Sequence, residues 1–428
     1  MMKKALKRAL RRLVKSPLFV LALPVVAVIR LLRPLLLVRI GALYSPRMGH
    51  FAANTELYLC ERDAGINLPR QRHVDLFYMS KPICNNELAT MWKRVLHVWP
   101  NWFLAPASRV NRLFSGWECH DVGDNTQLDR DVHNLLDKFP AHLKFTPTEE
   151  ARGMAGLRAM GIAPNDAFVC LNVRDSAYLQ AHQPSFDYSY HDYRDCDIQN
   201  FVLAAEELAA RGFHVVRMGA AVGKPIPSAH PRVIDYAANG MRSEFMDIYL
   251  GAKCAFCISV GSGFDAVPLI FRRPIVFANH VPVGYLNTFS SRFIGITKHH
   301  YGKAQERCLT LAEIVSHGVG FSLRAVDYRA QGIELIENTP EEIRDVVVEM
   351  AERLDGTWCA GEDEGELQER FRQIFPSDAR RNEAPLHGEI RSRYGAAFLT
   401  NNRWWLDPLS SNDVQHRPAG AQRQTINN

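Results

Sequence analysis

The Val-Gly-Ser-Gly loop of residues 260–263 is the clearest of several polar segments that follow apolar runs in this chain. It stands between a strand-like run, Ala255–Val260, and a helix-like run, Phe264–Phe271. Glycines let a ligand approach the backbone closely, and the first turn of a helix offers free N–H groups, so such a loop can hold a phosphate. A tight turn without a ligand is the alternative. The phosphate-binding residues predicted here are Gly261, Ser262 and Gly263.

Arginines and carboxylates end other runs of the same kind. Arg174 closes the run Phe168–Val173, where a guanidinium can neutralise a diphosphate leaving group as charge develops on it, which would make Arg174 catalytic. A surface ion pair with Asp175 is the alternative. Further along, an arginine with a glycine two residues after it, a carboxylate that could take ribose or sugar hydroxyls, and a second carboxylate that could hold the nucleoside extend the predicted site. These residues are Arg217, Gly219, Asp235 and Glu244.

Two other segments could carry chemistry. His50 follows the first strand-like run of the chain, and it and Glu56 are the candidate bases that would activate an acceptor. A surface histidine, and a glutamate in the middle of a helix, are the alternatives. The segment Tyr188–Asp197 is rich in polar and aromatic residues and either lines a cleft or forms a solvated connection.

No metal ligands and no cofactor are predicted, and the cysteines are expected to be reduced. Cys254 and Cys257 form a single C-x-x-C, but no second pair follows at zinc spacing, so the motif favours core packing. The nine cysteines are odd in number, scattered and partly within apolar runs, which is typical of buried thiols in a cytosolic protein.

The elements that must position these residues alternate between strand and helix in the second half of the chain. Capping boxes, which begin helices, occur at Thr146, Thr310 and Thr339. Strict alternation is typical of a parallel sheet covered by helices on both faces, and ligands bind such a sheet at the carboxyl ends of its strands. The predicted strands are Phe168–Val173, His214–Met218, Arg232–Asp235, Ala255–Val260 and Ile275–Phe277; the helices between them are Ile198–Arg211, Ser243–Leu250 and Phe264–Phe271.

The first half predicts a smaller α/β domain. A β-rich run, Leu35–Ile40, is followed by a polar break and a helical pattern over Ala52–Arg62. The expected organisation is therefore a membrane-associating segment over 1–34, a first Rossmann-like domain over 35–145 and a second Rossmann-like domain over 146–380. A C-terminal extension over 381–428 follows, disordered after about residue 410 on composition.

The N-terminus predicts contact with an anionic membrane. Eleven basic residues and no acidic one precede Glu56; removing them from the 51 basic residues leaves 40 against 46 acidic residues. An acidic body with a basic N-terminus argues against nucleic acid as partner. A basic amphipathic helix over Leu6–Lys15 and a short apolar run, Pro17–Ile29, favour a peripheral or monotopic anchor at the cytoplasmic face of an inner membrane. A secretory signal and a true span are the alternatives.

These residues resemble a family of bacterial glycosyltransferases found among surface-polysaccharide genes. The resemblance runs from about Leu35 to Arg372. Its motifs are Arg47-Met48-Gly49-His50, Asn54-Thr55-Glu56-Leu57-Tyr58-Leu59, Val173-Arg174-Asp175-Ser176-Ala177-Tyr178-Leu179, Tyr193-Arg194-Asp195, Val216-Arg217-Met218-Gly219, Phe245-Met246-Asp247-Ile248-Tyr249-Leu250, Val260-Gly261-Ser262-Gly263, Pro274 and Asn279.

The resemblance implies the GT-B fold, two Rossmann-like domains facing a cleft, with a wider likeness to heptosyl- and fucosyltransferases. Fucosyltransferase-like enzymes carry His-x-Arg-x-x-Asp, whereas Asn172 replaces the histidine here and Asp175 follows Arg174 directly. The expected activity is metal-independent transfer of a sugar from a nucleotide-sugar donor to a glycan or lipid-linked acceptor. A nucleotide-sugar epimerase of the same fold and a non-catalytic, membrane-bound glycan- or nucleotide-binding protein are the alternatives.

Overall fold

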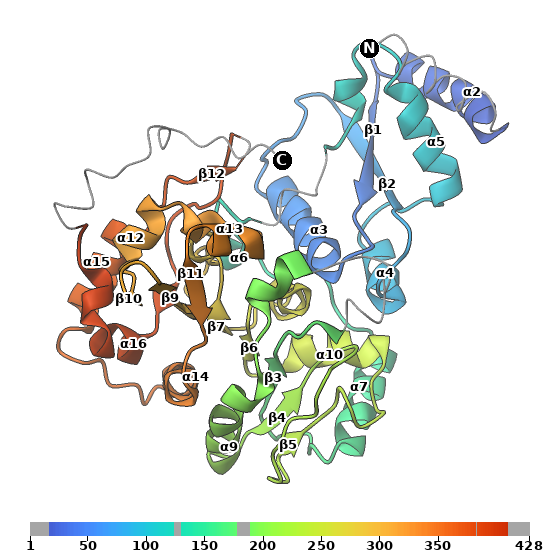
Figure 1. The fold of residues 1–428 in the computed structure, drawn as a ribbon. Coiled ribbons are helices and arrows are strands. Elements are labelled where there is room, and N and C mark those ends of the chain that lie inside the picture. Colours follow the sequence, from blue (N-terminus) through green and yellow to red (C-terminus); the bar gives the residue numbers. More distant parts are fainter. Residues whose placement is uncertain (1–16, 124–129, 178–188, 382, 410–428) are drawn as a thin grey trace. The chain divides into compact units, whose positions relative to one another are not determined.

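The computed structural model describes residues 17–123, 130–177, 189–381 and 383–409. The chain forms two compact units (Figure 1). Unit 1 comprises residues up to Asp129 together with Ala141–Lys144, and unit 2 comprises Arg130–Pro140 and the chain from Phe145 onward. The sequence boundary at residues 145 and 146 falls beside this division, but the short segment Arg130–Pro140 belongs to unit 2. The predicted helix over Leu6–Lys15 and the tail after residue 410 lie outside the described residues.

Unit 1 is built on one β-α-β unit. Strand β1 (Leu37–Leu43) pairs in parallel with β2 (His73–Met79), with Leu37 opposite His73 and Leu43 opposite Met79. Helix α3 (Met48–Asp63) makes the crossover between them, as the sequence pattern predicts. The other helices of this unit are α2 (Pro17–Leu31), α4 (Asn86–Lys93), α5 (Asn101–Asn111) and the 3-10 helix η1 (Trp117–His120).

A buried ion pair fixes the register of the two strands. Arg39 on β1 stands opposite Asp75 on β2, with its Nη2 2.5 Å from the carboxylate, and both side chains are buried. The Tyr58 hydroxyl of α3 donates to the same carboxylate over 2.6 Å, and burial raises the pKa of Tyr58 above its usual value. Since a charge removed from water is stable only when paired and hydrogen-bonded, these three side chains hold the crossover helix against the sheet.

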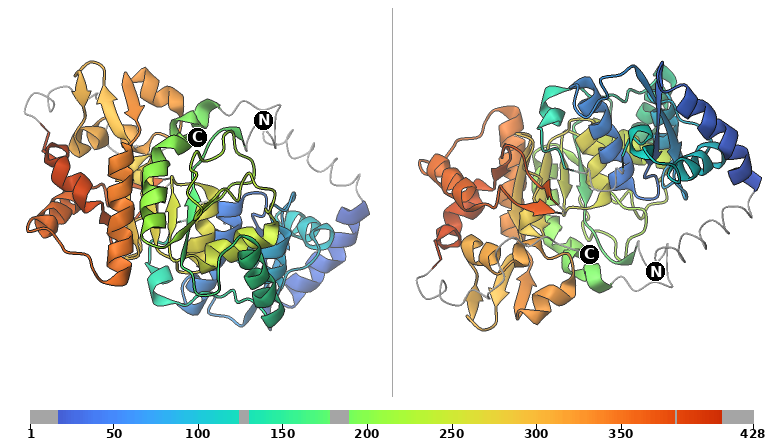
Figure 2. Two further views of the ribbon diagram at one scale, coloured as in Figure 1. Left: turned by 90° about the horizontal axis from the view of Figure 1, so that it is seen from below. Right: turned by 90° about the horizontal axis from the view of Figure 1, so that it is seen from above.

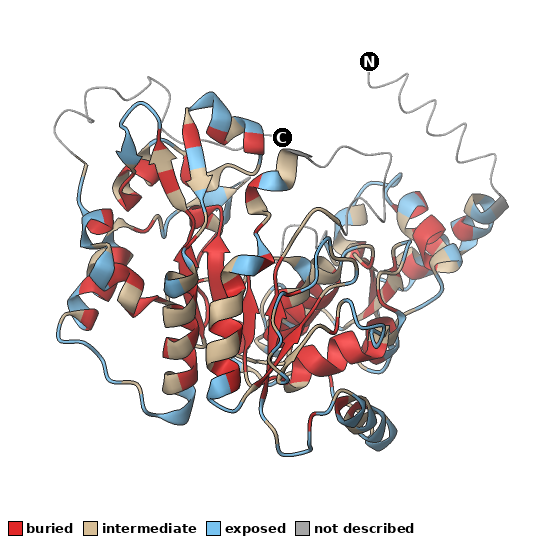
Figure 3. Ribbon diagram, turned by 60° about the horizontal axis from the view of Figure 1, so that its bottom comes forward, coloured by how far each residue is buried: buried red, intermediate tan, exposed pale blue. Residues whose placement is uncertain are grey.

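Unit 2 contains a parallel sheet of seven strands in the order β14-β8-β7-β6-β3-β4-β5. Figure 3 shows its central strands as buried, with helices around them. Because both faces are covered, the strands β3, β4, β6, β7 and β8 are buried at every residue rather than at alternate ones. The strands are β3 (Phe168–Asn172), β4 (His214–Arg217), β5 (Val233–Ile234), β6 (Cys257–Ser259), β7 (Ile275–His280), β8 (Phe293–Thr297) and β14 (Arg393–Tyr394).

Helices cover both faces of this sheet. Helices α9 (Val202–Ala210) and α14 (Pro340–Asp355) lie side by side on one face, and α7 (Pro147–Ala159) and α10 (Glu244–Lys253) lie on the other (Figure 2). The capping boxes predicted at Thr146, Thr310 and Thr339 are all formed. The remaining helices are α6 (Leu135–Lys138), α11 (Ala266–Ile270), α12 (Leu311–Ser316), α13 (Ala325–Ala330), α15 (Glu364–Ile374) and α16 (Ala396–Asn401); the 3-10 helices are η3 (Ser189–Arg194), η4 (Ile198–Phe201), η5 (Gly263–Asp265), η6 (Val283–Tyr285), η7 (Val319–Phe321) and η8 (Arg403–Leu406).

The α/β class and the Rossmann-like sheet predicted for the second half are confirmed. The sequence pattern did not reveal the outer strands β8 and β14, nor the small antiparallel sheet β10-β9-β11 formed by Arg307–Cys308, His299–Gly302 and Ile333–Ile336. A two-stranded ribbon of β12 (Arg380–Arg381) and β13 (Ala384–Pro385) was likewise not predicted. All nine cysteines are free thiols, and Cys254 and Cys257 are buried in the core, as predicted.

The apolar run after Pro17 forms helix α2, which packs one side against α5 through Ala22, Val26 and Ile29. Within the described ranges, the structure has no helix with the length and apolar character needed to cross a bilayer.

Candidate functional site

The carboxyl ends of β3 and β6 bring two predicted site segments together. The strands are neighbours in the sheet, and Asn172 stands opposite Ser259. The Asn172 side-chain amide donates to the Ser262 hydroxyl over 2.5 Å. The segments around Arg174 and Ser262, which are about ninety residues apart in the sequence, therefore meet at the edge where open parallel sheets bind ligands.

Internal hydrogen bonds hold the Gly-Ser-Gly loop in a fixed shape. The Gly261 amide donates to the Ser259 hydroxyl over 3.1 Å, and the Ser262 amide donates to the Asp265 carboxylate over 2.9 Å. The Ser262 hydroxyl oxygen accepts from Asn172 and from the Phe264 amide. With both lone pairs of this oxygen in use, its hydrogen can be donated to a ligand. Gly263 is exposed, so the end of the loop is open to a ligand.

Gly261 is the residue on which this shape depends. Its φ is +79°, in the left-handed region that glycine adopts without strain. A Cβ at this position would lie 2.8 Å from Nδ1 of His280, the last residue of β7. Arg194, at the end of η3, donates to the Gly261 carbonyl. Burial lowers the pKa of His280 to about 3, helped by the charges of Arg194 and Arg130, so the ring beside the loop is neutral.

Arg174 follows β3, the strand whose last residue, Asn172, bonds to this loop, and one edge of its guanidinium is available for a ligand. Its Nε is 3.2 Å from the Asp195 carboxylate, while its terminal nitrogens meet no partner among the described residues. Burial and the nearby charge of Arg194 lower the pKa of Arg174, against the opposing effect of Asp195. Burial also raises the pKa of Asp195 to about 6, although Arg174 opposes that shift. Two guanidinium groups and a partly desolvated carboxylate thus share a small volume.

Lys298 supports the segment that carries Arg194 and Asp195. The lysine follows β8, is 4% exposed, and donates to the Asp195 carbonyl over 2.7 Å. The Cys196 amide donates to the Arg174 carbonyl over 3.0 Å. The segment from Arg194 to Cys196 is therefore held by the backbone of Arg174, which follows β3, and by the side chain of Lys298, which follows β8.

This arrangement is suited to hold an anion with several oxygens. Arg174 offers a planar pair of donors, the Ser262 hydroxyl offers a third, and the loop exposes its last glycine. Such donors are positioned before the ligand arrives, so little reorganisation is needed when negative charge develops on a leaving phosphate. The chemistry that fits is binding of a diphosphate and stabilisation of its departure.

The structure gives Arg217 and Asp235 a different position from the one predicted. Arg217 ends β4, but its side chain is only 1% exposed and lies 3.3 Å from Asp235. The other Asp235 oxygen accepts from the Ile226 amide over 2.9 Å. A buried guanidinium cannot reach a ligand at the surface, so its assignment as a direct diphosphate contact is corrected to a structural ion pair. Gly219 lies in the turn after β4 with φ +156°, and Glu244 begins α10.

In unit 1, His50 lies in the first turn of α3, directly after the carboxyl end of β1. It is half-buried, its ring packs edge-on against Tyr44, and its Nδ1 has no hydrogen-bond partner in the described part of the chain. One turn later, Asn54 is 2% exposed, and neither polar atom of its amide meets a described partner. Since buried amides are normally satisfied, this pair of side chains is the place in unit 1 where a polar ligand is most expected.

Glu56 does not have the accessibility of an acceptor-activating base. It is 0% exposed on α3, and its Oε1 lies 3.0 Å from Nδ1 of His142. Its assignment as a catalytic base is therefore corrected: a carboxylate closed off from solvent and paired with an imidazole serves the packing of unit 1.

Sequence reasoning gave Arg194 and Asp195 no site role of their own, although it considered their segment as a possible cleft lining, and it missed Lys298 and His280. The polar and aromatic composition of Tyr188–Asp197 was a signal for the first two, whereas Lys298 and His280 carried none. The part of that segment before Ser189 lies outside the described residues.

Comparisons with known proteins give distant likenesses. No protein-family model and no curated protein match the chain. Among solved structures, a glycosyl transferase family 9 protein from Veillonella parvula is 12% identical, with 74% of this chain and 96% of that chain covered and a TM-score of 0.40. The ADP-heptose LPS heptosyltransferase II of E. coli is 13% identical, with 60% and 90% covered and a TM-score of 0.34. The E. coli heptosyltransferase WaaC is 12% identical, with 56% and 88% covered and a TM-score of 0.25.

Proposed function

We propose that the protein is a glycosyltransferase that moves a sugar from a nucleotide-sugar donor to a glycan or lipid-linked acceptor in bacterial surface-polysaccharide synthesis. The observation that carries the proposal is the group formed by Arg174, Arg194 and the Gly-Ser-Gly loop at the carboxyl edge of the large sheet. It combines a guanidinium with an available edge, a hydroxyl hydrogen and an exposed glycine, which are the donors that a diphosphate requires.

In this proposal the acceptor oxygen attacks the anomeric carbon while the bond from that carbon to the phosphate oxygen breaks. The nucleoside diphosphate leaves with the electron pair, and Arg174 and Ser262 stabilise the charge that develops on it. Fixed cationic and hydroxyl donors supply this stabilisation, so we propose that the transfer needs no metal ion. His50 is the proposed acceptor of the proton from the attacking hydroxyl.

The roles of the remaining predicted residues are adjusted to their positions. Gly261 and Gly263 shape and open the loop, and Arg194 holds it by bonding the Gly261 carbonyl. The buried Arg217 pairs with the partly exposed Asp235 and has a structural role, and Gly219 and Glu244 are proposed to lie toward the nucleoside.

We also propose that helix α2 binds an anionic membrane surface, at the cytoplasmic face of an inner membrane. The side of α2 away from α5 is apolar yet exposed, with Leu21 67% and Leu31 79% exposed. A hollow of about 630 Å³ lies beside it, lined by Leu23, Pro24, Val26, Ala27, Arg30, Leu31 and Phe114. An apolar face with arginines at its end suits the boundary between lipid headgroups and acyl chains.

The membrane proposal is tested by vesicle flotation of the full-length protein. Leu21→Glu should remove binding to vesicles that contain phosphatidylglycerol, whereas Val326→Glu, which alters an exposed apolar residue on α13, should not. Equal binding by the Leu21 variant would contradict the proposal.

The enzymatic proposal is tested by incubating the purified protein with a panel of labelled nucleotide sugars, with and without bacterial lipid and glycan extract. Label transferred to extract, together with release of nucleoside diphosphate, is the expected result, and Arg174→Ala should abolish both. Isomerised sugar in the absence of extract would instead identify an epimerase. Neither product, combined with no binding of nucleoside diphosphates, would identify a non-catalytic protein.

A further inference from the structure

Unit 1 contains a group of potential metal ligands that lies apart from the proposed diphosphate site. Glu56 and Cys60 are one turn apart on α3, so they project from the same face of the helix. His142, from the segment Ala141–Lys144, packs against that face. One ligand atom from each of the three residues lies within 4.8 Å of the other two.

We propose that Glu56, Cys60 and His142 bind one divalent transition-metal ion of the zinc class. The ligands would be a Glu56 oxygen, the Cys60 thiolate and Nδ1 of His142. Thiolate, imidazole and carboxylate are the ligands that zinc takes in proteins, and three of them leave the fourth tetrahedral position to water or to the second Glu56 oxygen.

The spacing of the ligand atoms fits such an ion after small movements. Around a tetrahedral zinc ion, neighbouring ligand atoms are about 3.4–3.6 Å apart, given metal–ligand bonds of about 2.0–2.3 Å. Here the Glu56 oxygen is 3.0 Å from Nδ1 of His142 and 4.0 Å from Sγ of Cys60. Shifts of about half an ångström, within the reach of side-chain rotation, would bring both separations to that range.

Asp63 provides the support that metal-bound histidines commonly have. Its carboxylate lies 2.9 Å from Nε2 of His142. A hydrogen bond from Nε2–H to a carboxylate fixes the tautomer that leaves Nδ1 free to coordinate, and it makes the ring a stronger ligand. Asp63 follows Glu56 by seven residues on α3, so the helix supplies two proposed ligands and the supporting group from one face.

Charge balance also favours an ion at this buried position. Glu56 and Cys60 are both 0% exposed, and the His142 side chain is 14% exposed. A divalent cation with one carboxylate, one thiolate and a neutral imidazole gives a set of zero net charge, which lowers the cost of burial. Because the coordinating atoms must carry no proton, binding of the ion is coupled to the release of protons. The ion would fasten the segment Ala141–Lys144 to α3 and so have a structural role.

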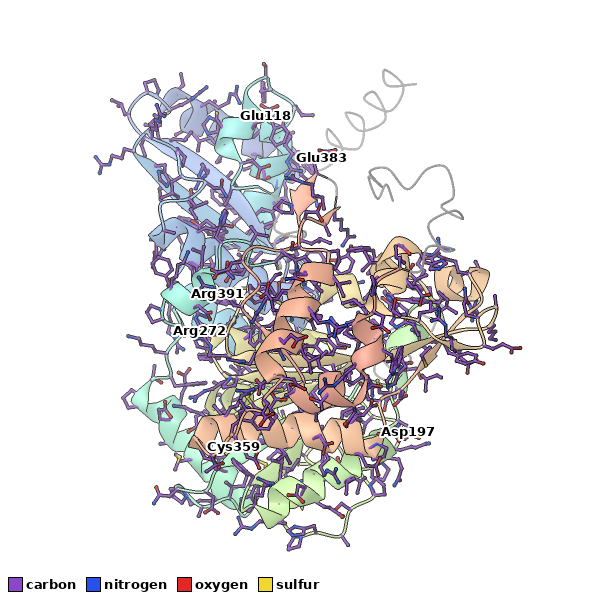
Figure 4. All side chains as sticks on the ribbon, turned by 90° about the vertical axis from the view of Figure 1, so that its left-hand side faces the viewer. Glu118, Asp197, Arg272, Cys359, Glu383 and Arg391 are labelled. Carbon is purple, nitrogen blue, oxygen red and sulfur yellow. The ribbon has the colours of Figure 1, made fainter. Side chains whose placement is uncertain are left out.

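The experiment uses untagged, full-length protein that has been stripped with a chelator and titrated with Co²⁺ and then Zn²⁺. We expect one equivalent of Co²⁺ to bind with a thiolate-to-cobalt charge-transfer band in the near ultraviolet, and Zn²⁺ to displace it and raise Tm. Cys60→Ser should remove the band and weaken Co²⁺ binding at least tenfold. The matched control is Cys359→Ser, which alters an exposed cysteine between α14 and α15 and should leave the band unchanged (Figure 4).

The proposal fails if the folded wild-type protein shows no such band, or if Cys60→Ser keeps it. In either case His142 is a protonated bridge between two carboxylates and needs no metal. If Cys60→Ser does not fold, His142→Gln takes its place: loss of the band supports the proposal, and an unchanged band overturns it.

Discussion

Replacing Arg174 by alanine should weaken the binding of nucleoside diphosphates by about a hundredfold. Its Nε is occupied by Asp195, so the two terminal nitrogens are the donors that a diphosphate would gain. A hydrogen bond between charged groups contributes about 1.5–3 kcal/mol. Two bonds at the lower end of that range give about 3 kcal/mol, which corresponds to about a hundredfold in Kd. Isothermal titration calorimetry with the diphosphates of adenosine, uridine, guanosine and cytidine measures the change.

The matched control for this measurement is Arg344→Ala on α14. Arg344 pairs with its neighbour Asp345 at the surface of unit 2, so its loss removes the same charge without altering the proposed site. We expect the Kd of the control to stay within about twofold of the wild-type value, because isolated surface pairs contribute little. If Arg174→Ala binds the best diphosphate as tightly as the control does, the placement of the leaving group at Arg174 is refuted.

Three further predictions concern stability and are read from chemical denaturation. Arg39→Ala leaves a buried carboxylate unpaired and should lower the unfolding free energy by about 3–5 kcal/mol; a loss below 1 kcal/mol would contradict the ion pair. Gly153→Ala should lower the unfolding free energy by about 1–3 kcal/mol, because a Cβ at position 153 would lie 2.2 Å from the Tyr249 ring. The control Gly365→Ala, which places a Cβ in open space on a helix, should leave the unfolding free energy unchanged or raise it. Burial disfavours the charged form of His142, but bonds to Cys60, Glu56 and Asp63 outweigh this effect and raise the pKa of His142 to about 10. With chelator present, His142→Gln should therefore lower the unfolding free energy by about 2–4 kcal/mol below pH 6.5. The difference between the variant and the wild type should fade as the pH rises through 10. A difference that grew with pH would contradict the pairing.

Local signals in the sequence predicted the elements that carry the site. A threonine, a proline at the first helical position and a glutamate three residues after the cap predict the start of α7, and the structure forms that capping box at Thr146. Apolar runs that end in glycine or arginine predicted β3 and β6, and their adjacency brings Asn172 to Ser262. These features depend on neighbours in sequence, which is why they could be read without a structure.

Features that depend on distant residues could not be predicted. The sequence places Arg217 at a strand end just as it does Arg174, yet β4 lies between β3 and β5, and the carboxylate of Asp235 after β5 draws Arg217 into the interior. Lys298 enters the site because β8 follows β7 in the sheet, and no local pattern marks it. For the same reason the sequence indicates Glu56 as an available base, whereas in the structure His142, eighty-six residues later in the chain, lies against it.

The prediction of no metal ligands depended on spacing along the chain. It considered the C-x-x-C of Cys254 and Cys257, whereas the proposed ligands in unit 1 combine a helical i, i+4 pair with a histidine from a distant segment. Such a set has no linear motif, and only the fold brings its members together.

The most direct test of the proposed donor site is a crystal structure of the full chain with the nucleoside diphosphate that binds best. We expect the two phosphates within hydrogen-bond distance of the Arg174 guanidinium, the Ser262 hydroxyl and the backbone at Gly263. A diphosphate bound elsewhere, with Arg174 and the Gly-Ser-Gly loop unoccupied, would contradict the proposed site and the mechanism built on it.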